Sequence, residues 1–470
     1  MKTLRVWAAA LLAGALPLAA AAQAPALTTF AVGPATVSAS ALATNLNTIW
    51  ELAWGPDNFL WMTERRGRIS RVDPATGQVL PVLTIPDVTE NNESGLLGLA
   101  VFEPNPGTTT PFATYWVFVV YNYTDQGVLK EKLVRYTYSS NGAIGSPLVL
   151  LGNIVATTTH SGSRLLVLPD RTLLMTTGDA QQLPEAQNRA SLNGKILRLN
   201  LDGTIPADNP TAGSPLYTLG HRNPQGLVRL PDGRLYSSEH GPNNDDEINR
   251  IEAGRNYGWP TVEGYCNLPA EATFCTANNV REPLTTWTPT IAPAGLAYYD
   301  HPAIPGWRGS LLLAVLKDSK LIQLTLDAAG NTIPTRTDYL TTFGRLRAIC
   351  VSPQGRVYIG TSNRDGRGNP AAPDDRILVL KNRAYLPSAT RPAQTLAFEL
   401  FPNPARRQAT LQLPAAGARV TVCDLLGRPV LVLPAAGPSA TLDLTGLRAG
   451  TYQVQAESPA GRATRKLVVE

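Results

Sequence analysis

The sequence predicts an all-β protein: a six-bladed β-propeller followed by a small C-terminal β-sandwich of the immunoglobulin-like kind. A short motif, in which a proline and a turn residue precede an apolar strand, recurs along most of the chain. Gly and Pro are abundant, at 39 residues each among 470, and long amphipathic helical patterns with caps are scarce. The hydrophobic fraction of 43% is ample for packed cores and argues against a disordered chain.

The recurring motif sets the number of units in the predicted propeller. In its clearest form it reads Pro-x-Gly-x-(Leu/Val)-Tyr, and units of this length with several strands each are typical of propeller blades. The alternative is a pair of β-sandwiches with coincidental turns, which the shared motif disfavours. Propeller loops meet on one face around the axis, so polar motifs beside these strands are expected to converge there. The six copies, spaced about 59 residues apart on average, begin at Pro56, Pro104, Pro169, Pro231, Pro305 and Pro353.

The first 22 residues resemble a signal peptide. Lys2 and Arg5 form a charged start, and Val6–Ala22 is an Ala/Leu-rich apolar run that ends in small residues. The alternative is a membrane anchor, but the run is short for a span and has no stop-transfer flank. We therefore expect an exported mature protein with no transmembrane span, whose residues 23–44 lead into the propeller.

The net charge of +5 belongs to the two ends of the chain. Residues 23–387 hold 30 basic and 31 acidic side chains, so the middle is balanced. A nucleic-acid-binding surface needs a clustered basic field, and we therefore expect no nucleic-acid partner.

The cysteines suit an oxidising compartment. Cys266 and Cys275 lie nine residues apart in a loop-like stretch, GYCNLPAEATFC, and are expected to form a disulfide, with two free thiols as the alternative. Cys350 and Cys423 lie in apolar runs and are expected in cores.

The composition changes after the predicted propeller domain, 45–383. Ala, Pro, Ser and Thr dominate 384–397, which is typical of a linker. Alternating strands separated by Gly/Pro turns then fill 398–470 and predict the small β-sandwich, which has no His and few acidic residues.

The first chemical candidate is His160. It opens the Gly/Ser turn THSGSRL and is followed by a strand that ends at Asp179. A His oriented by a carboxylate is a workable general base near neutral pH. For a lone His, a structural role is the more common alternative.

Two further groups of polar residues stand out. The run GPNNDDEINRI places Asp245, Asp246 and Glu247 behind a Gly-Pro turn, and carbonyl and carboxylate oxygens suit Ca²⁺, although a solvated acidic turn is the alternative. Basic residues also recur at strand ends in separate units, and their convergence would bind a polyanionic small molecule rather than remain scattered surface charge. These residues are Arg222, Lys317, Arg345 and Arg347.

Several segments, taken in order, identify a family resemblance. They are ESGLLGLAVFEP, HSGSRLLVLPD, LNGKILRLNLDG, LGHRNPQGL, EHGPNNDDEIN with GRNYGWP, and LKDSKL with RLRAI. In this order and spacing they resemble the soluble quinoprotein sugar dehydrogenases of the glucose/sorbosone dehydrogenase family, over about residues 45–382. The resemblance implies a six-bladed propeller that uses pyrroloquinoline quinone (PQQ) and Ca²⁺ to oxidise an aldose to its lactone, with an external electron acceptor.

The resemblance also implies a role for individual residues. His160 is similar to the catalytic base that takes the proton from the sugar C1 hydroxyl, and Asp179 to the acid that orients it. Arg222 corresponds to a residue close to the reacting carbonyl of the cofactor. The implied PQQ-binding residues are Arg222, Asn223, His240, Lys317, Arg345 and Arg347. The implied calcium ligands are Gly241 and Pro242 at the cofactor and Glu247 and Tyr257 at a second, structural site.

The chain departs from the family pattern at three positions near this implied site. Glu93 stands where the glucose enzyme has a substrate-contacting Gln, so we assign it to the substrate side. Thr159 replaces an Asp just before the catalytic His, and Ala348 replaces the Asp that follows the second Arg of an Arg-x-Arg-Asp pattern.

The C-terminal unit carries a second resemblance. FPNPA, DLLGRPV and the run LRAGTYQVQ followed by RKLVVE are similar to the type IX secretion sorting domain of Bacteroidetes. This resemblance implies export across the outer membrane by that machinery, with release or attachment at the cell surface and removal of the tail.

Two other functions compete with an exported aldose dehydrogenase. The first is a non-enzymatic propeller that binds a carbohydrate or protein partner, against which the retained cations and His160 count. The second is a calcium-dependent lactonase or esterase, which would need acidic and Asn ligands at the axis but no set of cations.

Overall fold

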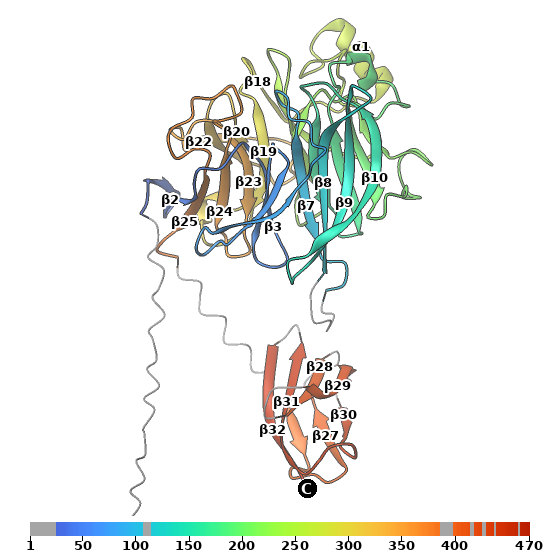
Figure 1. Cartoon of the computed structure of the whole chain (residues 1–470), viewed down its shortest axis with the longest axis vertical. Coiled ribbons are helices and arrows are strands. Elements are labelled where there is room, and N and C mark those ends of the chain that lie inside the picture. The colour runs from blue at the N-terminus through green and yellow to red at the C-terminus, as the bar shows by residue number, and fades with distance from the viewer. Residues whose placement is uncertain are drawn as a thin grey trace, which may run out of the picture. The chain divides into compact units, whose positions relative to one another are not determined.

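The computed structural model describes residues 25–106, 114–385, 398–413, 418–424, 429–436, 439–458 and 461–470. The predicted signal peptide, 1–22, and most of the predicted linker, 384–397, lie outside the described residues. The chain divides into two compact units, Met1–Ala384 and Tyr385–Glu470. Nearly all of the regular structure in both units is β-strand (Figure 1).

Five sheets of the first unit are four-stranded, antiparallel and formed from consecutive strands. The first two contain β3 (Ile49–Trp54), β4 (Leu60–Glu64), β5 (Arg68–Val72) and β6 (Val79–Thr84), and β7 (Leu96–Phe102), β8 (Thr114–Asp125), β9 (Val128–Ser139) and β10 (Ile144–Val155). The next two contain β11 (Gly162–Val167), β12 (Thr172–Thr177), β13 (Lys195–Asn200) and β14 (Leu216–Leu219), and β15 (Pro224–Arg229), β16 (Leu235–Glu239), β17 (Asp246–Ile251) and β18 (Thr285–Trp287). The fifth contains β19 (Pro293–Tyr299), β20 (Ser310–Val315), β21 (Lys320–Thr325) and β22 (Thr335–Tyr339).

A further sheet of this unit joins its two ends. Its strands, in order, are β1 (Thr28–Val32), β2 (Ala35–Ala43), β25 (Ile377–Asn382), β24 (Val357–Thr361) and β23 (Leu346–Val351). β2 pairs antiparallel with β25, with Val37 opposite Asn382. The segment expected to be only a lead-in, 23–44, therefore supplies two strands.

The recurring prolines share one structural position. Each lies in the connection between the first strand of a repeat and the strand that follows it, where a fixed φ and a missing N–H donor suit a turn. The connections are β3–β4 for Pro56, β7–β8 for Pro104, β11–β12 for Pro169, β15–β16 for Pro231, β19–β20 for Pro305 and β23–β24 for Pro353.

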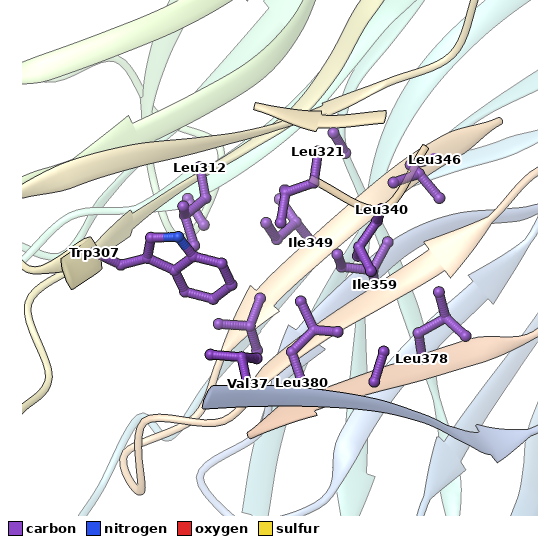
Figure 2. Close-up of a cluster of buried hydrophobic side chains, with 14 of the residues drawn as sticks. Val37, Trp307, Leu312, Leu321, Leu340, Leu346, Ile349, Ile359, Leu378 and Leu380 are labelled. Atoms are coloured by element: carbon purple, nitrogen blue, oxygen red, sulfur yellow. The ribbon is translucent and has the colours of Figure 1, made fainter. Parts of the chain in front are cut away.

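The first strands of the six repeats, β3, β7, β11, β15, β19 and β23, form a closed ring. β3 packs against β7, β7 against β11, and so on through β15, β19 and β23, which packs back against β3. Apolar clusters fill the space between neighbouring sheets, as Figure 2 shows for Trp307, Leu312, Ile349 and Leu380. The repeated four-stranded sheets and their ring of first strands are consistent with a β-propeller.

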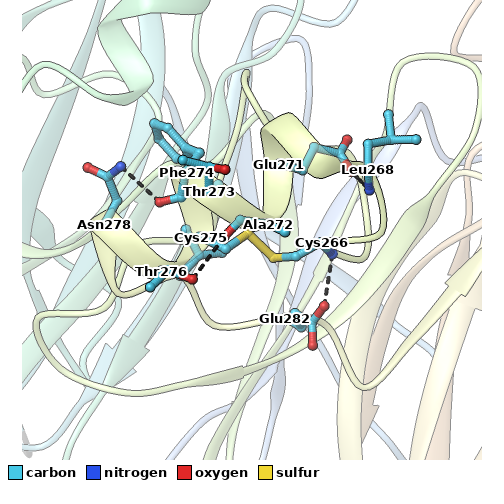
Figure 3. The surroundings of a disulfide bond; sticks show 12 residues. Cys266, Leu268, Glu271, Ala272, Thr273, Phe274, Cys275, Thr276, Asn278 and Glu282 are labelled. Carbon is cyan, nitrogen blue, oxygen red and sulfur yellow. Dashed lines mark hydrogen bonds between the residues drawn. A yellow bond between two sulfur atoms is a disulfide. The ribbon is translucent and has the colours of Figure 1, made fainter.

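The segment between Cys266 and Cys275 differs from its expected loop-like form. The helix α1 (Pro269–Asn278) contains Cys275, and its start is stabilised by Glu271, whose side chain accepts a hydrogen bond from the N–H of Leu268 at 3.0 Å. A disulfide joins the two cysteines (Figure 3). Two short 3₁₀ helices, Leu183–Ala186 and Pro305–Trp307, complete the helical structure of the described residues.

Replacing both cysteines of this disulfide by serine is expected to lower the stability of the first unit. Closing a loop of this length stabilises a folded chain by about 2–3 kcal/mol in the chain-entropy model. Thermal unfolding of the full chain measures the loss. Reductant should destabilise the unmodified protein to a similar extent and leave the double variant unaffected, and equal stability of the two proteins would contradict the prediction.

The second unit contains two sheets that enclose one apolar cluster. The first has β26 (Glu399–Phe401), β27 (Gln408–Gln412) and β30 (Ser439–Asp443), and the second has β29 (Pro429–Ala436), β28 (Ala418–Cys423), β31 (Gly450–Ser458) and β32 (Gly461–Val469). Leu411 and Leu442 from the first sheet and Val422 and Val454 from the second are all buried in that cluster. Among the helices that the structure describes, none is long and apolar enough to cross a membrane.

Candidate active site

The sheet topology explains why the predicted site residues gather. In an antiparallel hairpin the start of the first strand lies beside the end of the second, and Gly162 is paired in this way with Thr177. Residues just before a first strand and just after a second strand therefore share one face of the ring. Glu93, His160, Arg222, Asn223 and Arg345 precede first strands, whereas Asp179, His240 and Lys317 follow second strands.

A cavity of about 500 Å³ opens at this face. Its lining brings together most of the predicted residues and several that the sequence did not single out. Residues that the sequence analysis named and that line the cavity are Glu93, Thr159, His160, Arg222, Asn223, His240, Gly241, Pro242, Asp246, Lys317 and Arg345, and the others include Gln181, Thr290 and Arg367. Arg347 and Asp179 are not part of the lining and are buried beside it.

His160 is held by a buried carboxylate. Its Nδ1 lies 2.7 Å from Oδ1 of Asp179, whose side chain is fully buried. The other carboxylate oxygen of Asp179 accepts a hydrogen bond from the Trp259 indole at 2.9 Å, and Oδ1 also accepts one from the Gln181 N–H at 2.8 Å. Because a carboxylate only accepts, this contact places the imidazole proton on Nδ1 and leaves Nε2 as the basic nitrogen.

The backbone around His160 is unusually tight. His160 itself has a positive φ of 58°, a conformation that non-glycine residues adopt at an energetic cost. A Cβ on Gly178 would lie 1.8 Å from the His160 carbonyl oxygen, so a glycine is required where this segment passes the end of β12. Strain of this kind is common where a side chain is held for a function.

The predicted cations have different environments. Lys317 is exposed to the cavity, and its Nζ donates to the Thr290 hydroxyl at 3.0 Å. Burial lowers the pKa of Arg222, whose guanidinium donates to the His240 carbonyl at 3.1 Å. Arg345 lines the cavity, whereas Arg347 lies beneath it and donates to the Gln225 side chain at 3.1 Å. The set therefore supplies three cations to the cavity and a fourth behind it.

Asn223 and His240 also line the cavity but are partly engaged inside the protein. The side-chain oxygen of Asn223 accepts hydrogen bonds from the Gly162 N–H and the Gln225 amide, at 3.0 and 3.2 Å. Burial and the neighbouring Arg222 lower the pKa of His240 to about 3, so this ring is neutral. Its Nε2 faces the Pro293 carbonyl at 2.9 Å and must donate there, which leaves Nδ1 as an acceptor.

Two backbone carbonyls at the cavity wall are candidates for a cation. Within the described ranges no hydrogen bond reaches the carbonyl of Gly241 or Pro242. The neighbouring Asp246 is engaged by the N–H groups of Gly241 and Ala292, at 2.8 and 2.7 Å, and burial raises its pKa to about 6. The part of the chain that the structure describes has no group of three or more His, Cys, Asp or Glu that could hold a metal ion.

Glu247 and Tyr257 line a second, smaller cavity, of about 10 Å³, next to the first. That volume suits a single small ion or water. Burial and the carboxylate of Glu239 raise the pKa of Glu247, whose oxygens accept hydrogen bonds from the Gly264 N–H and the Asn249 amide. The Tyr257 hydroxyl is engaged elsewhere, since it donates to the Arg250 carbonyl at 2.7 Å.

Glu93 is paired with a residue that the sequence did not single out. One of its oxygens lies 2.7 Å from a terminal nitrogen of Arg367, and the other accepts a hydrogen bond from the His160 N–H at 3.3 Å. Asp365, on the same connection between β24 and β25, pairs with Arg345 at 2.8 Å. Both residues lie in the stretch SNRDGRG, 362–368, but nothing in the sequence indicates which strand ends they reach.

Comparisons with known proteins show the families to which the two units belong. Residues 46–378 match the family model of the glucose/sorbosone dehydrogenases, and residues 399–470 match that of a secretion system C-terminal sorting domain. The chain is 33% identical to quinoprotein glucose dehydrogenase B of Acinetobacter calcoaceticus, over 72% of this chain and 87% of that protein. It is 29% identical to the aldose sugar dehydrogenase of Escherichia coli, over 71% of this chain and 92% of that protein.

A solved structure shows the same relationship. The PQQ-bound aldose sugar dehydrogenase of Streptomyces coelicolor superposes with a TM-score of 0.63 at 33% identity, covering 74% of this chain and 99% of that one. A putative glucose dehydrogenase of Thermus thermophilus superposes equally well, with a TM-score of 0.63 at 36% identity, over 73% of this chain and 99% of that one. The family model matches most of the chain, and the cations and the His–Asp pair gather at one cavity. This chain therefore belongs to the glucose/sorbosone dehydrogenase family and carries a C-terminal secretion sorting domain.

Proposed function

We propose that this protein is an exported aldose dehydrogenase that uses PQQ and Ca²⁺ and in which His160 is the general base. The observation that carries the proposal is the hydrogen bond between His160 Nδ1 and buried Asp179, at the wall of a cavity that Arg222, Lys317 and Arg345 also line. A base and a set of cations in one cavity suit the oxidation of an alcohol beside an anionic cofactor.

The residues at the cavity fit PQQ, which has three carboxylates. Lys317 and Arg345 would bind carboxylates directly, and Arg222 would lie near the quinone, where burial in a partly apolar wall strengthens its charge effects. Neither terminal nitrogen of Arg345 makes a hydrogen bond within the described residues, so both are available to an anion. When bound, PQQ would supply the acceptor of the hydride from C1 of the sugar.

His160 would act on the C1 hydroxyl of the aldose. Its Nδ1 proton is held by Asp179, so Nε2 accepts the hydroxyl proton while the C1–O bond gains carbonyl character and the lactone forms. The imidazolium produced is stabilised by the same carboxylate. An external electron acceptor would then complete the turnover.

The Gly241 and Pro242 carbonyls fit a Ca²⁺ ion at the cofactor, because hard carbonyl oxygens without hydrogen-bond partners are the ligands that this ion prefers. We propose Glu247 and the backbone carbonyl of Tyr257 for the second, structural ion, whose positive charge would offset the buried carboxylate of Glu247.

Reconstitution of the full chain tests this function. The protein is purified without cofactor, Ca²⁺ and PQQ are added, and dye reduction is followed with a panel of aldoses. Sugar-dependent reduction that requires PQQ supports the proposal. Absence of PQQ binding would instead favour a carbohydrate- or protein-binding propeller, and hydrolysis of a lactone with Ca²⁺ alone would favour a calcium-dependent lactonase.

On the substrate side, Glu93→Gln is expected to change the charge preference of the site. The substitution removes the carboxylate that pairs with Arg367 at 2.7 Å and leaves a guanidinium facing the cavity beside His160. The ratio of kcat/KM for a uronic acid to that for its neutral aldose should rise about tenfold, a difference of about 1.4 kcal/mol.

The double variant Glu93→Gln/Arg367→Gln is the control for this change. It has lost the guanidinium as well, so the gain for the uronic acid should disappear. An unchanged ratio in the single variant would show that Glu93 and Arg367 do not face the substrate.

We further propose that the sheets of the first unit are the six blades of a propeller and that the second unit is an immunoglobulin-like sandwich. The ring of first strands from β3 to β23 supports six blades, and the cluster enclosed by two sheets supports the sandwich. The sorting domain supports export by the type IX machinery. Removal of a signal peptide, 1–22, would leave β1 intact.

A further inference from the structure

Three arginines gather around Asp365, two at its carboxylate and one at its backbone carbonyl. Asp365 lies on the connection between β24 and β25, and its side chain is only 3% exposed. Its Oδ2 accepts a hydrogen bond from Nε of Arg345 at 2.8 Å and lies 3.8 Å from a terminal nitrogen of Arg347. Its backbone carbonyl accepts a hydrogen bond from Arg65 at 3.4 Å. Three separate segments of the chain therefore meet at this residue.

The residue that follows Arg347 departs from the family pattern. Where the family pattern places an Asp after the second arginine, this chain has Ala348, which is fully buried in an apolar cluster with Ile49 and Tyr358. An unpaired carboxylate would be costly there. Asp365 provides a negative charge to the same two arginines from a different strand connection.

The connection that carries Asp365 is packed closely on Arg345. A Cβ on Gly368 would lie 2.9 Å from the Arg345 Cδ and 2.6 Å from the Asn363 carbonyl oxygen, so only glycine fits there. The side chain of Asn363 in turn accepts a hydrogen bond from the Arg345 N–H at 2.8 Å. Both the backbone and the side chain of Arg345 are thus fixed by this one connection.

The terminal nitrogens of the Arg345 guanidinium are available to a ligand. Asp365 engages Nε, at the base of the guanidinium, whereas the two terminal nitrogens make no hydrogen bond within the described residues. Arg345 also lines the main cavity. A guanidinium held at Nε can present its two terminal N–H donors to one carboxylate, which is the strongest form of this interaction.

The carboxylate of Asp365 also offsets the positive charges of the arginines around it. Burial, together with Arg345 and Arg65, lowers the pKa of Arg347 to about 10, and the carboxylate of Asp365 opposes this shift. Burial would raise the pKa of Asp365, but Arg347 and Arg345 outweigh it and hold that pKa below its ordinary value. Without the carboxylate, three like charges would repel one another and the two arginine side chains would separate.

We propose that Asp365 is a positioning residue that holds Arg345 in the orientation in which it binds a carboxylate of the ligand in the main cavity, with Arg347 held behind it. The inference rests on the proposed function for the identity of that ligand, PQQ. Asp365 does not contact the reacting atoms and acts through Arg345. In metal sites, residues that orient a ligand-binding side chain in this way commonly change affinity by about 10- to 100-fold when replaced.

Asp365→Asn in the full chain tests the inference by cofactor affinity rather than by turnover. PQQ is titrated into the cofactor-free protein with Ca²⁺ present, and the dissociation constant is measured by calorimetry. We expect binding about 10- to 100-fold weaker than that of the unmodified protein. Asp365→Glu retains the charge at a shifted position and should recover part of the affinity, which a merely structural role would not predict.

Asp57→Asn is the matched control. Asp57 forms a similar shielded pair, with Arg71 at 2.8 Å, but lies in the β3–β4 connection and does not line the cavity. It should lower the thermal unfolding temperature without changing the dissociation constant of PQQ.

A parallel titration with citrate, a tricarboxylate, separates the inference from the proposed function. If the unmodified protein binds citrate but not PQQ, and Asp365→Asn weakens citrate binding, the positioning role stands and the cofactor is wrong. If Asp365→Asn binds PQQ as tightly as the unmodified protein, or more tightly, Asp365 competes with the ligand and the inference is overturned. Failure of the unmodified protein to bind either anion overturns both.

Discussion

Replacing His160 by alanine is expected to lower kcat for aldose oxidation by about 10²- to 10⁴-fold, the range that a positioned general base contributes. The substitution removes Nε2, the nitrogen left basic by the contact of Nδ1 with Asp179. The cations that would bind PQQ stay in place, so the dissociation constant of PQQ should change little. Dye reduction under saturating PQQ and Ca²⁺ measures the first effect and calorimetry the second.

His301→Ala is the control for this substitution. His301 does not line the main cavity. It lies in the connection between β19 and β20, where its Nδ1 accepts a hydrogen bond from the Ala303 N–H. Its removal should leave kcat unchanged. A rate in His160→Ala equal to that of the unmodified protein would exclude His160 as the base and transfer the role to another group at the cavity.

Asp179→Asn is the second substitution with a large expected effect. Three donors surround this carboxylate: the imidazole of His160, the backbone N–H of Gln181 and the indole of Trp259. An asparagine has one oxygen and one NH₂ group, so in either orientation it presents a donor to at least one of these donors. With its NH₂ group toward His160, it would move the imidazole proton to Nε2, and the base would be lost.

The expected loss in kcat is about 10²- to 10⁴-fold, the range that a general base contributes, because the inverted tautomer no longer offers a basic nitrogen to the substrate. It is measured by dye reduction at saturating sugar, with PQQ affinity as the internal reference. Adding Trp259→Phe should restore part of the rate, because the NH₂ group can then face the ring and the oxygen can face His160. If the double variant is no faster than Asp179→Asn, the tautomer argument is wrong.

The regular part of the fold was accessible from the sequence because local rules decide it. A proline and a turn residue followed by alternating apolar residues encode a hairpin directly. All six predicted prolines lie in the connection between the first and second strand of a repeat. The same rule placed His160 and Lys317 beside strand ends, where the antiparallel register brings them to one face.

The remaining features depend on contacts between distant segments. Asp365 and Arg367 lie on a long connection whose path is set by packing against Arg345 and Glu93, and no periodicity reports that path. The helix α1 forms where Pro269 begins it and Glu271 stabilises its first turn. These signals were overlooked because the two cysteines led to the prediction of a loop. The strand β2 was missed because its partner, β25, lies at the other end of the unit.

The pairing of β2 with β25 joins the N-terminal and C-terminal segments of the first unit in one sheet. Val37 and Asn382 are opposite each other, so the last sheet cannot be completed until almost the whole unit has been made. A contact between such distant residues is slow to form, and until it does β25 exposes an unpaired edge that can recruit another chain. Under the proposed export with the N-terminus first, β2 would emerge before β25 and stay unpaired until β25 follows. Removal of the residues of β2 would therefore leave β25 as an unpaired edge of the last sheet.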